Sequence, residues 1–165
     1  SSPRRQRQMC IRDRYNFGTD QNNWSPGANR ITLKYSEKTT VIWKLDNDQY
    51  SRFIADGYAP NTDAVAHNFI TRDGYEDILQ SPTVVVIQGP LYNDEATTLP
   101  SVLTVGVGPV TIFYEGKYIE GTWRRNDISD PFEFLDESQN KIDVPPSKQW
   151  IHLLPLNGEI TISDN

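Results

Sequence analysis

Arg52 and Asp63 are the residues whose types and spacing most clearly suggest recognition of a ligand. Arg52 follows Tyr50 by two positions in an alternating, partly apolar segment, so its guanidinium needs a carboxylate or carbonyl partner if it is buried. Two interpretations stay open. Either Asp63 pairs with Arg52 and pins the 56–82 region to a sheet, or Arg52 binds the carboxylate of a ligand.

Aromatic side chains are a second candidate for binding, because flat rings with a polar edge can stack on the faces of sugars. The chain has four Trp, eight Tyr and six Phe. Trp123, beside Arg124 and Arg125, is the best candidate for an exposed platform, and sugar binding would require Trp123, Tyr118 or Trp24 to lie exposed on one face. Trp43 and Trp150 alternate with aliphatic residues and are expected in the core.

Other chemistries find little support in the sequence. His67 and His152 are the two histidines, and their spacing does not match a metal-binding motif. Glu115 and Glu120 could form the carboxylate pair of a glycosidase, but solvated charges on a hairpin are the simpler interpretation. Asp46-Asn47-Asp48 lacks the later ligands of a calcium loop and is expected to form a turn. We therefore predict no catalytic residue, no metal and no cofactor, and an enzymatic role is not favoured.

Residues 1–14 differ sharply in composition from the rest of the chain. They hold five arginines and one aspartate, together with the sole Met and the sole Cys. They resemble translated sequencing-adapter read-through, and we expect them to be a non-native segment. Residues 15–165 carry 21 acidic and 11 basic side chains, so nucleic acid is not an expected partner.

The hydrophobic pattern predicts the elements that position these side chains. Residues 15–29 read as an irregular lead-in, and residues 30–163 as a single β domain. Short alternating segments at about ten-residue spacing predict a mainly antiparallel β sandwich or barrel of about nine to ten short strands. At most one short helix is expected, over Tyr75–Leu79. The longest aliphatic run, Val84–Ile87, is far shorter than the roughly 20 apolar residues of a membrane helix.

The segments with a strand pattern are 30–35, 40–45, 49–55, 83–88, 101–105, 110–115, 117–125, 132–135, 141–144, 150–154 and 159–163. The segment 83–88 is apolar on both faces, which is typical of a central strand covered on both sides. Glu115-Gly116 is expected to form a tight hairpin, and Asn157-Gly158 another.

Several short landmarks occur in an order that resembles the C-terminal domain of the YerB-like lipoprotein family, a bacterial family without an established reaction. The resemblance spans about residues 30–163. It rests on Tyr50-x-Arg52, Gly57, Asp63, the strand Val84–Gln88, Gly106-x-Gly108, Gly116-Lys117, Gly121-Thr122-Trp123, Trp150-Ile151 and Pro155.

This resemblance implies an extracytoplasmic domain that forms the C-terminal half of a larger lipoprotein, with a lipid anchor upstream as its contact with the membrane. The expected partners are the N-terminal domain of the same protein, and a cell-wall glycan or an envelope protein. Three roles stay open: a non-enzymatic binding or structural domain, a cell-wall carbohydrate-binding module, or an accessory domain of an enzyme whose catalytic half lies elsewhere. The candidate binding residues are Arg52, Asp63, Tyr118 and Trp123.

Overall fold

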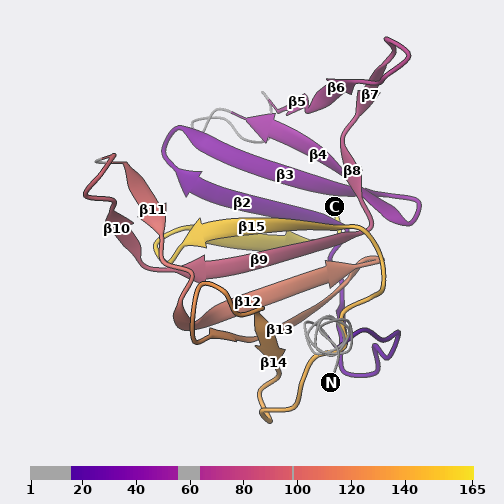
Figure 1. Ribbon diagram of the computed structural model, residues 1–165. Helices are drawn as coiled ribbons and strands as arrows, with labels where there is room; N and C mark the ends of the chain where they lie inside the picture. Colours follow the sequence, from indigo (N-terminus) through magenta and orange to yellow (C-terminus); the bar gives the residue numbers. More distant parts are fainter. Residues whose placement is uncertain (1–15, 56–63, 98) are drawn as a thin grey trace, which may run out of the picture.

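The computed structural model describes residues 16–55, 64–97 and 99–165, and these ranges contain strands and turns but no helix (Figure 1). Two six-stranded sheets pack against each other, and two separate two-stranded hairpins lie at the periphery. The predicted all-β fold is confirmed, as a sandwich and not a closed barrel. Asp63 and the segment 1–14 fall outside the described residues.

The first sheet has the strand order β1-β13-β12-β9-β15, with β14 also paired to β13. All its pairings are antiparallel except the parallel pairing of β15 with β9. Its strands are β1 (Ser25–Pro26), β9 (Thr83–Gly89), β12 (Gly106–Tyr114), β13 (Lys117–Arg125), β14 (Glu133–Leu135) and β15 (Gln149–Pro155).

The second sheet has the order β16-β2-β3-β4-β5, with β8 also paired to β4. Its strands are β2 (Arg30–Ser36), β3 (Thr39–Asp46), β4 (Gln49–Ala55), β5 (Val65–Ala66), β8 (Gln80–Ser81) and β16 (Glu159–Ser163). The two hairpins are β6 (Asn68–Ile70) with β7 (Glu76–Ile78), and β10 (Leu91–Asn93) with β11 (Pro100–Val102); Figure 1 shows both projecting from the sandwich.

Two apolar cores lie on opposite faces of the first sheet. The core between the sheets includes Trp43 and Tyr50 from the second sheet and Val84, Val86 and Phe113 from the first. The outer core lies on the other face of the first sheet. The sheet contributes Val85, Ile87, Val110, Ile112 and Trp123, and these side chains are covered by Trp24, Phe134, Ile142 and Val144. Strand β9 is therefore buried on both faces, as its unbroken apolar sequence predicts.

Some local predictions are wrong. Tyr75–Leu79 does not form a helical turn, because Glu76–Ile78 pairs with β6 as strand β7. Asn157-Gly158 does not close a hairpin, because β15 and β16 belong to different sheets and the turn crosses between them. Residues 141–144 form isolated bridges instead of a strand. The Glu115-Gly116 hairpin is confirmed, and both residues have positive φ, at 48° and 76°.

No helix in the described ranges is long and apolar enough to cross a membrane.

Candidate functional site

Arg52 lies at the edge of the core between the two sheets. It stands opposite Trp43 in the register of β3 and β4, so both side chains point toward the first sheet. The guanidinium carbon is 5.2 Å from the centre of the Trp150 ring and 6.0 Å from that of Trp43. Cation–π contacts of this kind strengthen as water is excluded from them. The contacts of Arg52 with these two Trp rings could not be predicted from the sequence, because the rings come from different strands.

The guanidinium is only partly satisfied by hydrogen bonds. Its Nη1 donates to His67 Nδ1, while its buried Nε–H has no acceptor among the residues that the structure describes. A buried donor without an acceptor costs about 1–3 kcal/mol. Burial lowers the pKa of Arg52, against a smaller opposing effect of Tyr35. Among the described residues, no carboxylate forms an ion pair with this arginine.

A network of hydrogen bonds lies beside Arg52 in the same core. Trp43 Nε1–H donates to His152 Nε2 at 2.8 Å, and His152 Nδ1 lies 2.5 Å from Tyr35 Oη. An indole N–H can only donate, so His152 Nε2 carries no proton. The neutral imidazole then holds its proton on Nδ1 and donates it to Tyr35, whose own hydroxyl proton is left for another acceptor.

Burial keeps the side chains of this hydrogen-bond network uncharged. The side chain of His152 is 4% exposed, and desolvation, reinforced by Arg52, lowers its pKa to about 3. Desolvation also raises the pKa of Tyr35 to about 12, in spite of the nearby guanidinium. The bonds of His152 to Trp43 and Tyr35 could not be predicted from its spacing to His67 in the sequence.

A cleft of about 280 Å³ adjoins the Arg52 cluster and shares Trp150 with it. Main-chain bonds hold the two together, since Arg52 N–H donates to the carbonyl of Leu79, a residue that lines the cleft. The lining is Phe69, Asp77, Ile78, Leu79, Gln80, Lys148 and Trp150.

The prediction that Trp123 is an exposed platform is wrong. Its side chain is 1% exposed and belongs to the outer core, where its ring meets the Phe132 ring edge-on. Its indole N–H donates to the carbonyl of Gln88 at 2.7 Å. The side chain of Arg124 points to the opposite face of β13, as neighbours in a strand do, and pairs with Glu133.

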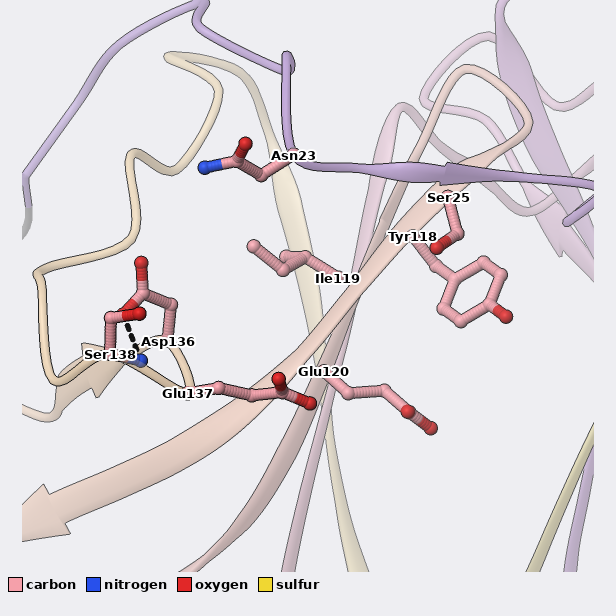
Figure 2. Close-up of a pocket in the computed structure, with 8 residues that line it drawn as sticks. All are labelled: Asn23, Ser25, Tyr118, Ile119, Glu120, Asp136, Glu137 and Ser138. Carbon is pink, nitrogen blue, oxygen red and sulfur yellow. Dashed lines mark hydrogen bonds between the residues drawn. The ribbon is translucent and has the colours of Figure 1, made fainter.

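Tyr118 is half-buried and lines a larger groove, of about 450 Å³ (Figure 2). The groove also includes Asn23 and Ser25 from the N-terminal segment, Ile119 and Glu120 from β13, and Asp136, Glu137 and Ser138 from the loop after β14. In Figure 2 the side chain of Glu137 extends toward Glu120, whereas the carboxylate of Glu120 points away from Glu137. Sequence reasoning named Tyr118 here but missed the partners, which come from distant segments.

The groove lies over a gap in the edge of the first sheet. On the side of β13 away from β12, β1 pairs with residues 117–118 and β14 with residues 122–124. Within the described part of the chain, no strand pairs with residues 119–121 between them on that side. A second hollow of about 120 Å³ continues the groove, sharing Asn23, Ile119 and Asp136 with it.

The carboxylate pair considered from the sequence does not assemble. Glu115 lies in the β12–β13 turn, whereas Glu120 stands opposite Thr111 further along the strand. Across the described ranges, no group of three or more His, Cys, Asp or Glu side chains is placed to hold a metal ion. The turn at Asp46-Asn47-Asp48 is confirmed, with Asn47 at φ 55°.

Comparisons with known proteins agree on one family. Residues 31–151 match the family model described as the C-terminal domain of a protein of unknown function (DUF3048). The crystal structure of the YerB protein from Bacillus subtilis superimposes with a TM-score of 0.62 at 14% sequence identity, over 89% of this chain and 46% of the YerB chain. This chain thus spans about half the length of that protein, and no curated protein sequence matches it. The chain belongs to the DUF3048 family, as a YerB-like C-terminal domain of unknown function.

Proposed function

We propose that this chain is the C-terminal, ligand-binding domain of an exported lipoprotein, and that its groove binds a glycan of the cell envelope. The family match to a C-terminal domain and the 46% coverage of the YerB chain support a larger parent protein. The lipid anchor and the location outside the cytoplasm rest on the resemblance to the YerB-like lipoprotein family. The proposal assigns binding and no reaction.

The composition of the groove carries this proposal. One Tyr ring stands among planar amide and carboxylate groups and two hydroxyls, which are the side chains that pair with sugar hydroxyls. The unpaired edge of β13 at residues 119–121 lies at its base and offers further main-chain donors and acceptors. A ring-shaped polyhydroxyl ligand can use all three kinds of group at once.

The negative charge of the groove indicates which class of glycan it binds. The groove and the hollow that continues it are lined by five carboxylates and one amine, those of Asp20, Glu120, Asp136, Glu137, Asp143 and Lys141. This potential repels phosphate and uronate groups. The expected ligand is therefore a neutral glycan, such as one built of N-acetylated hexosamines.

The test is isothermal titration of the protein with β-1,4-linked N-acetylglucosamine oligomers. We expect measurable binding, and roughly two- to tenfold weaker binding by Tyr118→Ala, since an aromatic contact contributes about 0.5–1.5 kcal/mol. Tyr92→Ala, on the exposed β10–β11 hairpin, is the matched control and should bind like the unmodified protein. An absence of heat with neutral oligomers, or equal losses in both variants, would contradict the proposal.

A third variant separates binding from a fold defect. Glu137→Gln keeps the shape of an exposed loop residue and removes one carboxylate from the groove. We expect this variant to change affinity for the oligomer without changing the melting temperature. If Tyr118→Ala loses both affinity and melting temperature while Glu137→Gln changes neither, then Tyr118 supports the fold and does not contact the ligand.

A further inference from the structure

Arg52 has a buried donor for which the described residues provide no acceptor. Its Nε–H is shielded from solvent without an acceptor, and His67, which meets Nη1, brings no negative charge that would neutralise a guanidinium. Buried polar groups in native proteins almost always have partners, so an orphan donor on a cation points to an acceptor supplied from elsewhere.

Two residues that line the neighbouring cleft, Trp150 and Leu79, are in contact with Arg52. Trp150 packs against the guanidinium and also lines the cleft, and Leu79 joins the two through its main chain. Four of the seven lining side chains are apolar or aromatic, and Lys148 adds a second positive charge. Of the lining residues in the described ranges, Asp77 alone carries a carboxylate.

These observations select the chemistry of the ligand. A guanidinium fork pairs with a planar carboxylate through two parallel hydrogen bonds. The walls formed by Phe69, Ile78 and Leu79 suit an apolar body. A doubly charged phosphate would bring extra negative charge close to Asp77, so a monocarboxylate fits better.

We propose that Arg52, backed by Trp150, anchors the carboxylate of a small apolar acid whose body lies in this cleft. The site lies apart from the glycan groove, shares no lining residue with it, and stands whether or not the groove binds sugar. The acid comes from one of two sources, the free C-terminus of an apolar peptide or a short fatty acid, and the recognition chemistry is the same for both.

The test is an NMR titration of the ¹⁵N-labelled chain that follows the Arg52 Nε–H and Trp150 Nε1–H signals. The probes are N-acetylleucine, its neutral amide N-acetylleucinamide, and hexanoate. We expect both acids to shift both signals and the amide to shift neither. A response to N-acetylleucine alone identifies a peptide terminus, and a response to hexanoate alone identifies a fatty acid.

Matched arginine variants check the assignment. Arg52→Lys keeps the charge but loses the fork and should bind at least fivefold more weakly, while Arg52→Gln should not bind. Arg72→Gln, at an exposed residue between β6 and β7, should bind like the unmodified chain. Tyr118→Ala should also leave acid binding unchanged, which separates this site from the groove.

Three results would overturn the inference: no shift with either acid, equal shifts with acid and amide, or an Arg72→Gln loss as large as that of Arg52→Gln. If Arg52→Gln does not fold, the comparison of acid with amide on the unmodified chain still decides the question.

Discussion

His152 should make the stability of this domain depend on pH between about 5 and 7. The imidazole is buried, and desolvation lowers its pKa from 6.5 to about 3. The unfolded chain therefore binds a proton on His152 below pH 6.5 that the folded chain does not bind. Stability from this residue is present in full above pH 6.5 and is lost as the pH falls toward 3.

The size of the effect follows from the pKa difference. Each pH unit between the two pKa values costs about 1.4 kcal/mol, so acidification from pH 6.5 to 5 should remove about 2 kcal/mol of unfolding free energy. His152→Gln should lack this dependence, although the variant is less stable at pH 7 because the bonds to Trp43 and Tyr35 change.

Urea unfolding followed by Trp fluorescence at pH 7, 6 and 5 measures the difference directly. The informative quantity is the pH dependence of the unfolding free energy of the unmodified protein minus that of His152→Gln, because other titrating groups contribute equally to both proteins. Equal slopes in the two proteins would refute the description of His152 as a buried neutral imidazole.

Two further substitutions test the packing. Tyr50→Phe removes a buried hydroxyl that donates to the Ala28 carbonyl at 2.8 Å and accepts from Gly116 N–H at 3.1 Å; we expect a loss of about 2 kcal/mol in urea unfolding, whereas no loss would show that these bonds contribute nothing. Gly121→Ala places a methyl group 2.2 Å from the carbonyl oxygen of Leu135 and should separate β13 from β14 at a cost of about 1–3 kcal/mol, with an unchanged melting temperature contradicting this contact.

Local patterns predicted most of the long strands, because alternation and unbroken apolar runs report directly on which faces are buried. The short strands were harder. The pairs β6–β7 and β10–β11 are exposed hairpins with little alternation, and the helical expectation at Tyr75–Leu79 failed because cross-strand pairing with β6 decides the conformation there.

The site around Arg52 was predictable only in part, because the residues that contact Arg52 come together through tertiary packing. Arg52 was singled out because a charge on an apolar strand needs a partner, but the Trp43 and Trp150 rings that surround it come from two different sheets. Trp123 was the best candidate for an exposed platform because Arg124 and Arg125 follow it. The sequence does not show that irregular segments return to cover that face of the first sheet as the outer core.

A crystal structure of the protein soaked with a β-1,4-linked N-acetylglucosamine oligomer tests the proposed binding groove most directly. We expect density for a sugar ring against Tyr118, with its hydroxyls bonded to side chains of the groove and to the open edge of β13 at residues 119–121. An empty groove at a concentration that saturates the protein in solution, or sugar bound on another face, would contradict the proposal.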